Sequence, residues 1–194
     1  MESLYESWAK RNPSWERRYQ STVVDVFCDY GKGVSSFLEA RGKIFGAGYE
    51  IFIIAFFIGI NHNRTKPLIE DRDKKKVFGQ AIQYWGNIEN RIGRTSYGNI
   101  RRYIFAALIA RTDIDFIALD KGEITLRTVV DKMMEKMEEY ANYGFDYIED
   151  KLANDPNYYF SDVAFLTEIT NMLVASKTTE SDNDLDDELP ESLD

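Results

Sequence analysis

Ten apolar residues follow one another without interruption at residues 51–60, in the sequence IFIIAFFIGI. A helix that crosses a membrane needs about 20 such residues, whereas a run of about 10–14 is more typical of a helix buried in a protein core. Glu50 precedes the run, and the polar residues Asn61-His62-Asn63-Arg64 follow it. We therefore expect a core helix at about 49–60, with binding at a membrane surface as the alternative interpretation.

The other segments also show helical spacing of apolar residues together with helix-capping residues. Expected helices run from Asn12-Pro13 to Gly31, at 34–40, from Asp71 or Asp73 to about Asn90, from Ser96 to Arg111, at 126–141 after a Thr125 cap, at 145–152 after an interruption at Gly144, and from Ser161 onward. Residues 114–119 fit a short helix or a single extended strip. We find no alternating strand pattern. The predicted fold class is all-α, a single compact multi-helix domain over residues 1–177.

Composition places the chain among globular proteins. The hydrophobic share is 44%, with only 4 Pro and 12 Gly in 194 residues. The one cysteine, Cys28, excludes an intramolecular disulfide and fits a reducing compartment. The N-terminus carries acids where a signal peptide would carry bases. We expect a cytoplasmic protein in which Cys28 is an unreactive thiol.

Charge is divided unevenly along the chain. Residues 1–111 carry 18 Lys and Arg against 11 Asp and Glu, whereas residues 112–194 carry 6 against 22. Residues 178–194 hold eight of those acids, no base and no aromatic residue, and we expect them to form a disordered acidic tail. The body without this tail is close to neutral, so the remaining asymmetry is a basic N-terminal region and a moderately acidic C-terminal one.

Basic residues gather in the middle of the chain, among tyrosines. The cluster consists of Lys74, Lys75, Lys76, Arg91, Arg94, Arg101 and Arg102, with Tyr97 among them. Three lysines in the first turn of a helix work against the helix dipole, which prefers acids there. Arginine beside aromatic residues suits nucleic acid and protein interfaces alike. Pairing with the acidic half of the same chain is the third interpretation.

No signature of catalysis or metal binding accompanies this pattern. His62 is the only histidine, and no neighbouring Cys or second His completes a transition-metal site. With Arg64, His62 forms either an anion contact or the capped C-terminal end of the apolar helix. Glu135, Glu138 and Glu139 are expected on a solvated helix face. We therefore assign no catalytic residue, no metal and no cofactor.

Two stretches resemble known proteins. Residues 50–68, EIFIIAFFIGINHNRTKPL, and residues 139–150, EYANYGFDYIED, are similar to elements of small helical accessory proteins encoded beside DNA phosphorothioation (Dnd-type) modification and restriction systems. That group usually has a Gly-Gly pair in the second element, where this chain has Tyr143 before Gly144. The resemblance implies an accessory role in prokaryotic anti-phage defence and supplies no catalytic residues.

These observations lead to one main functional hypothesis. The chain is expected to be a non-enzymatic accessory or adaptor protein that contacts DNA, or a DNA-bound partner, through its basic face, without a membrane contact. The acidic tail is expected to compete with nucleic acid for that face. The alternatives are a protein-interaction subunit without nucleic-acid contact and a carboxylate-based hydrolase. The oligomeric state is not predicted.

Overall fold

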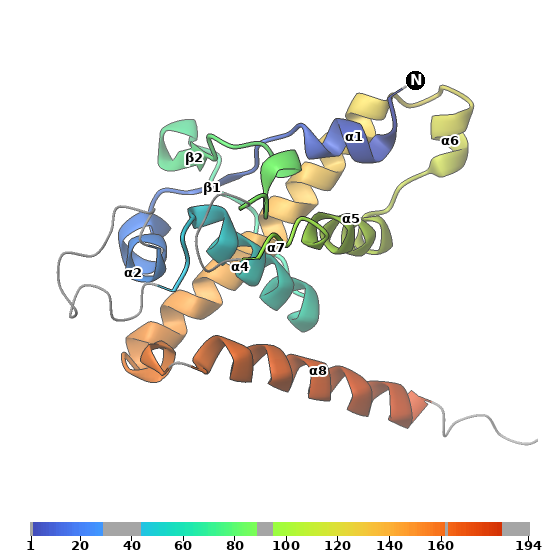
Figure 1. Ribbon diagram of the computed structural model, residues 1–194. Helices are drawn as coiled ribbons and strands as arrows, with labels where there is room; N and C mark the ends of the chain where they lie inside the picture. Colours follow the sequence, from blue (N-terminus) through green and yellow to red (C-terminus); the bar gives the residue numbers. More distant parts are fainter. Residues whose placement is uncertain (1, 29–43, 89–94, 162, 184–194) are drawn as a thin grey trace, which may run out of the picture. The chain divides into compact units, whose positions relative to one another are not determined.

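Figure 1 shows the computed structural model, which describes residues 2–28, 44–88, 95–161 and 163–183. The chain forms two compact units, Met1–Asp150 and Lys151–Asp194. The expected helix at 34–40 lies outside the described residues. Within them the structure is mostly helical, as predicted, but it also contains a two-stranded sheet that no alternating pattern in the sequence indicates.

Unit 1 contains most of the elements. In chain order they are α1 (Leu4–Ala9), β1 (Ser14–Glu16), the π-helical turn η1 (Gln20–Val24), α2 (Asp25–Phe27), α4 (Gly48–His62), the 3-10 turn η2 (Arg72–Lys74), β2 (Lys75–Val77), the 3-10 turn η3 (Ile82–Tyr84), α5 (Ile100–Arg111), α6 (Phe116–Asp120) and most of α7 (Leu126–Asn154). The ambiguous segment at 114–119 is therefore largely helical, since Asp115 caps α6 by accepting from the Ala118 amide.

Helix α4 is the predicted core helix. Most of its apolar side chains are buried, among them Ile51, Phe52, Phe56 and Ile58, each 0% exposed, whereas Ile54, Phe57 and Ile60 are partly exposed. The helix ends at Asn63, which adopts the left-handed conformation at φ 49°. The Asn63 amide donates to the Ile60 carbonyl and so caps the helix. None of the helices in the described ranges is long and apolar enough to span a membrane.

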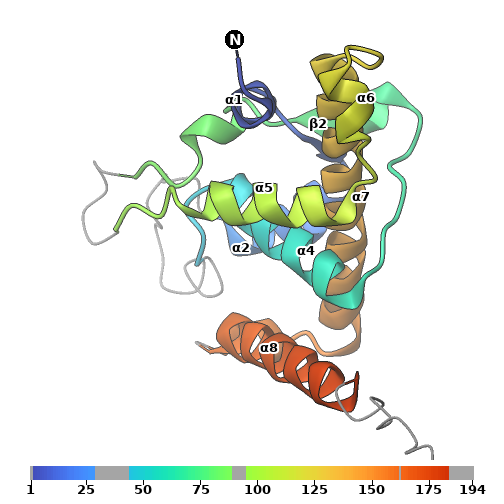
Figure 2. The same cartoon turned by 90° about the vertical axis from the view of Figure 1, so that its right-hand side faces the viewer.

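Helices α4 and α7 pack against each other (Figure 2), and their backbones approach most closely at two glycines. A Cβ at Gly59 would overlap the backbone of Tyr140, and a Cβ at Gly144 would overlap the backbone of Ala55. The prediction that Gly144 interrupts the long helix is wrong, because α7 continues unbroken from Leu126 to Asn154. Glycine serves here to let two backbones approach closely, and it does so without ending the helix.

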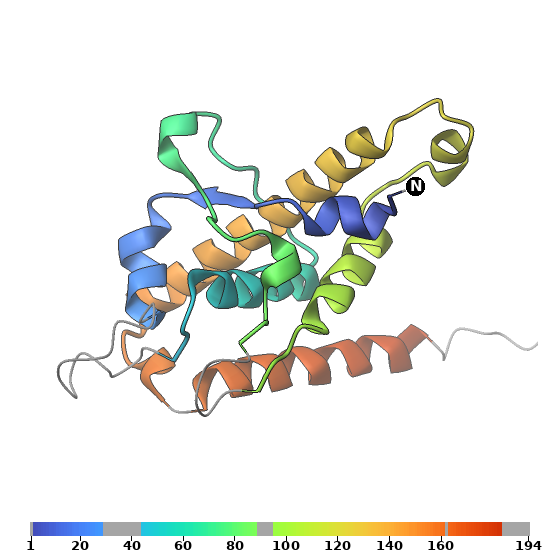
Figure 3. The same cartoon turned by 45° about the horizontal axis from the view of Figure 1, so that its top comes forward.

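The expected helix from Asn12-Pro13 to Gly31 is correct over Gln20–Phe27, where η1 and α2 follow one another, and its last residues lie outside the described ranges. The expected helix from Asp71 or Asp73 to about Asn90 is wrong except for the short turns η2 and η3. Ser14–Glu16 and Lys75–Val77 instead pair as antiparallel strands, with Trp15 opposite Lys76. Figure 3 shows β1 passing over α7, where the Ser14 amide donates to Glu138 at 2.7 Å. The physical reason lies in the lysines: a helix start with three cations opposes its own dipole, whereas a strand has no such dipole to oppose.

Aromatic rings connect the β1–β2 pair with helix α4. Trp85 stacks on Tyr49 with a centroid distance of 5.3 Å and meets Phe52 and Phe78 edge-on at 5.8 Å each. Trp15 of β1 also stacks on Phe78, with a centroid distance of 5.7 Å. Trp15 therefore reaches the core from a strand and not from a helix.

Unit 2 contains the end of α7, the 3-10 turn η4 (Tyr158–Phe160) and α8 (Ala164–Asn183). Tyr159 stacks on Phe165 at 4.7 Å. The buried Glu168 accepts from Lys151 at 2.8 Å and from Tyr158 at 2.7 Å. Helix α8 continues beyond residue 177, so the first six residues of the expected tail are helical and the remainder lies outside the described ranges.

Candidate nucleic-acid interface

The β1–β2 pairing brings an arginine from the N-terminal segment to the lysine cluster. The Arg17 amide donates to the Lys74 carbonyl at 2.8 Å, and its Nε donates to the Lys75 carbonyl at 3.1 Å. Arg72 and Lys74 are exposed beside it, while Lys75 and Lys76 are half-buried. We call Arg17, Arg72, Lys74, Lys75 and Lys76 the cationic ribbon.

The lysines of the cationic ribbon keep their charges near the surface. Lys74 lies 3.6 Å from Asp71, and 65% of its side chain is exposed, so this pair is weak. Lys76 donates to Gln20 at 2.7 Å and lies 5.7 Å above the Trp15 ring, which orients its ammonium without neutralising it. Asp71 also accepts from the Asp73 amide at 3.0 Å and so holds the turn that precedes β2.

A network of charged residues anchors β1 to α7. Glu16 is only 7% exposed and accepts from Arg18 at 2.8 Å, the Ile69 amide at 2.9 Å and Asn142 at 3.1 Å. Burial alone would raise the pKa of Glu16, but these hydrogen bonds outweigh it and hold the pKa below its usual value. Glu16 therefore stays ionised at neutral pH.

Asp146 is the second acid of this network. It accepts from Lys66, from Arg18 and, at 2.7 Å, from the Tyr19 hydroxyl. Burial again opposes ionisation, yet the three donors lower the pKa of Asp146 overall. For Tyr19, burial and the bond to Asp146 raise the pKa. Arg18 and Lys66 are thus occupied within the fold, and we do not count them in the cationic ribbon.

The two stretches that carry the family resemblance meet at this network. Lys66 from the first stretch pairs with Asp146 from the second, and the Lys66 amide donates to the Glu139 carbonyl at 3.0 Å. The Asn142 side chain donates to the Lys66 carbonyl at 3.2 Å and the Pro67 carbonyl at 3.0 Å. The two elements therefore form one packed substructure.

The structure places the remaining predicted basic residues elsewhere. Arg91 and Arg94 lie outside the described residues. Arg101 donates to the carbonyls of Gln83 and, at 2.9 Å, Gly98, so its guanidinium holds two backbone segments together. Arg102 is exposed on α5, which lies apart from β2 in all three ribbon views. The described basic residues consequently do not form the single face that their sequence spacing indicated.

Tyr97 has a structural partner. Its hydroxyl donates to Glu50 at 2.5 Å, and the same carboxylate accepts from the Gly46 amide at 2.6 Å. Burial and the bond to Glu50 raise the pKa of Tyr97, which therefore remains a neutral hydrogen-bond donor. Beside this pair lies a pocket of about 290 Å³ whose other walls are the apolar residues Phe45, Ile53, Ile54 and Ile100.

His62 and Arg64 lie at the C-terminal end of α4. The His62 Nδ1 is 3.2 Å from the Tyr143 hydroxyl, and its ring meets Tyr147 with a centroid distance of 4.9 Å. The Arg64 amide bonds to the Gly59 carbonyl at 3.1 Å, completing the helix cap. This end of a helix dipole is negative, so the geometry favours the capping interpretation over an anion contact.

The other candidate groups fall into separate environments. Among the residues that the structure describes, no three His, Cys, Asp or Glu side chains are grouped so as to hold a metal ion. Cys28 is buried, as expected for a core thiol. Glu138 departs from the expected solvated face: it is half-buried under β1, and burial raises its pKa. No protein-family model, curated protein or solved structure matches the chain.

Proposed function

We propose that this protein is a non-catalytic accessory protein that binds the phosphate backbone of DNA through the cationic ribbon. The observation that carries the proposal is the strand pairing that places Arg17 beside Lys74 and Lys75. Exposed Arg and Lys side chains on a fixed backbone are the groups that make phosphate contacts, and such contacts position a protein on DNA without reading sequence.

The resemblance supplies the proposed setting, a DNA phosphorothioation or related anti-phage defence system. The support from the fold is that both resembling stretches pack on each other, through Lys66 and Asp146 and through the glycine contacts of Gly59 and Gly144. In this setting the cationic ribbon would dock the accessory protein on the DNA that its partners modify or cleave.

A charge-reversal pair tests the proposal. Arg72→Glu with Lys74→Glu changes two exposed side chains of the cationic ribbon, and Lys121→Glu with Lys132→Glu makes the same change in net charge on exposed residues elsewhere in unit 1. We expect the first pair to weaken binding to a duplex, measured by fluorescence anisotropy in about 50 mM salt, at least tenfold. The slope of the logarithm of the binding constant against the logarithm of the salt concentration should decrease by about one for each phosphate contact that is lost.

The control pair should have a much smaller effect. Equal losses for the two variants would reduce binding to a non-specific effect of net charge. No binding by the native chain in about 50 mM salt, where phosphate contacts are strong, would rule the proposed function out. A chain ending at Asn183 tests the screening role expected of the acidic tail, because α8 stays complete: its affinity for the duplex should rise.

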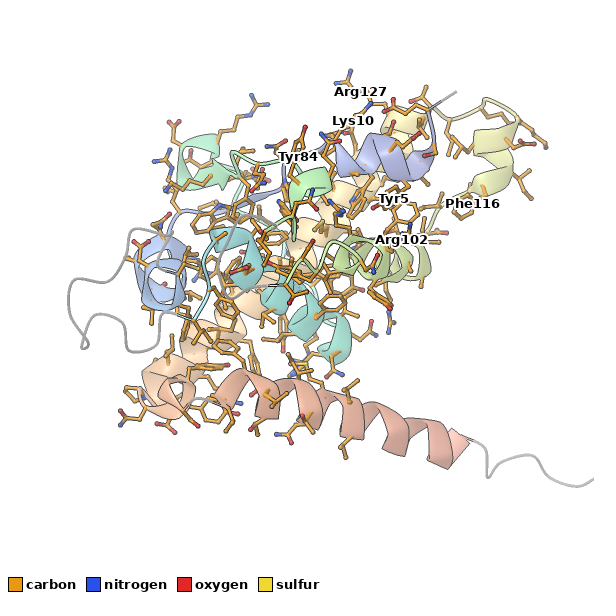
Figure 4. The ribbon with its side chains drawn as sticks, viewed as in Figure 1. Tyr5, Lys10, Tyr84, Arg102, Phe116 and Arg127 are labelled. Carbon is orange, nitrogen blue, oxygen red and sulfur yellow. The ribbon has the colours of Figure 1, made fainter. Side chains whose placement is uncertain are left out.

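A second candidate function is docking on a larger protein. Figure 4 labels Tyr84 on η3, Arg102 on α5 and Tyr5 on α1. Tyr84 is 51% exposed and Tyr103 is 67% exposed, and exposed Tyr with Arg is the composition of interaction hot spots. Association that survives nuclease and about 0.5 M salt, and that Tyr84→Ser with Tyr103→Ser abolishes, would favour this function.

A further inference from the structure

Helix α8 and the residue just before it, Val163, carry a row of exposed apolar side chains that shares no residue with the cationic ribbon. Val163, Leu166, Ile169, Leu173 and Val174 are 54%, 63%, 39%, 60% and 61% exposed. We call these five residues the α8 stripe. The opposite side of the same helix is covered within unit 2, where Ala164, Phe165 and Glu168 are buried. Isolated exposed aliphatic residues are ordinary, but a continuous row on one helix marks an interaction site.

The spacing of the stripe is that of a helix–helix seam. Val163, Leu166, Thr170 and Leu173 follow one another at steps of three, four and three residues. This alternation of three and four is the repeat by which two helices interdigitate at a small crossing angle. Ile169 and Val174 flank the seam and widen it. The stripe is therefore shaped for another helix with the same repeat.

Charge narrows the choice of partner. Between residues 163 and 176 the only ionisable side chain is Glu168, which is 5% exposed and bonded to Lys151 and Tyr158. The outward side of this segment therefore has no cationic side chain that would bind a phosphate group. A helix that lies on a membrane surface carries Lys and Arg on its polar face, and this segment has neither. An uncharged partner helix fits, and the chain itself supplies one.

We propose that the α8 stripe pairs with the α8 stripe of a second copy of this chain, with the two helices antiparallel. All the acids of residues 178–194 follow the stripe at one end. A parallel pair would bring both sets of acids together, whereas an antiparallel pair separates them. Leu166 of one copy then faces Leu173 of the other, and the two-fold axis passes near Thr170. The contact is isologous, as in most homodimers.

Sedimentation of the full chain over a range of concentrations tests the pairing. We expect a monomer–dimer equilibrium that Leu173→Asp weakens at least about tenfold. Asn171→Asp adds the same charge on an exposed residue away from the stripe and should leave the equilibrium unchanged. A chain that stays monomeric at about 0.2 mM, or a dimer that Leu173→Asp does not weaken, would overturn the proposal, including the case in which another part of the chain covers the stripe.

Disulfide trapping tests the orientation. The native Cys28 is buried, so a cysteine introduced on the stripe is the accessible thiol among the described residues. Mixed Leu166→Cys and Leu173→Cys chains should form a cross-linked heterodimer on mild oxidation. Leu173→Cys alone should remain largely uncross-linked, because its two copies lie on opposite sides of the axis. Efficient cross-linking of Leu173→Cys alone would show a parallel pair and contradict the proposal.

Discussion

Gly144 of α7 lies so close to Ala55 of α4 that a single added Cβ would overlap the Ala55 carbonyl group. The overlapped atoms belong to the backbone, so a change of rotamer cannot relieve the clash. The same relationship recurs one helical level away between Gly59 and the backbone of Tyr140. These two contacts set how closely the core helix and the long helix pack.

Gly144→Ala should therefore destabilise the protein, although alanine is the better helix former. Overpacking a close contact costs about 1–3 kcal/mol or more, which exceeds the gain of about 1 kcal/mol in helix propensity. Urea denaturation measures the difference. Gly79→Ala is the matched control, because a Cβ there meets nothing within 4 Å. Equal stability of the two variants would contradict the packing argument.

Asp146→Asn should lower the free energy of unfolding at pH 7 by about 1–2 kcal/mol, because it removes the charge to which Arg18 and Lys66 donate while both partners stay partly solvated. The pKa of Asp146 is lowered in the fold, so its stabilisation is complete above the unfolded-state value and disappears as the pH falls through the folded-state value. The native chain and the variant should therefore converge in stability only at a pH below the ordinary aspartate pKa of about 3.9. A difference that persists there would exclude the ionic mechanism.

Glu138→Gln should behave in the opposite way. Burial raises the pKa of Glu138, so its ionised form is held in the fold at a cost at neutral pH. The glutamine oxygen still accepts from the Ser14 amide, now without a buried charge. We expect equal or higher stability of the variant at pH 7 and a shrinking difference as acid protonates the native Glu138. Thermal unfolding at pH 7 and pH 4 measures both, and a marked loss at pH 7 would refute the burial argument.

Arg101 and Arg102 are neighbours with different expected roles. Arg101→Ala should cost about 1–2 kcal/mol of stability, since it leaves the Gln83 and Gly98 carbonyls without their charged donor. Arg102→Ala should leave stability within about 0.5 kcal/mol, because the residue is exposed. Chemical denaturation of the two variants side by side measures the contrast. The reverse order would show that Arg102 is the structural residue.

Local signals in the sequence were sufficient to predict the helices that have a clear apolar pattern or a capping residue of their own. The apolar run predicts α4, and the Thr125 cap is confirmed by its bond from the Thr128 amide at 3.1 Å. The β1–β2 pair could not be predicted in this way, because each strand has only three residues and the two strands come from distant parts of the chain. The one local warning was the conflict between three lysines and a helix N-terminus.

The candidate site was predictable only in part for the same reason. Lys74, Lys75 and Lys76 stand out as a run, but nothing local to Arg17 indicates that it joins them. Arg101 and Tyr97 looked equally available for binding, but each is held by a group distant in sequence: Arg101 by the Gln83 carbonyl and Tyr97 by the Glu50 carboxylate. Long-range pairing decides both which residues gather and which are occupied.

The anchoring of β1 on α7 also has a consequence for synthesis on the ribosome. Arg18 and Asp146 are 128 residues apart, so the N-terminal strand emerges well before its anchor. At about 5–20 residues per second this interval lasts roughly 6–26 s. During it the apolar α4 segment leaves the ribosome while α7, which covers it in the folded protein, is still being made. The apolar α4 segment is thus most prone to aggregation during synthesis, before its partner helix exists.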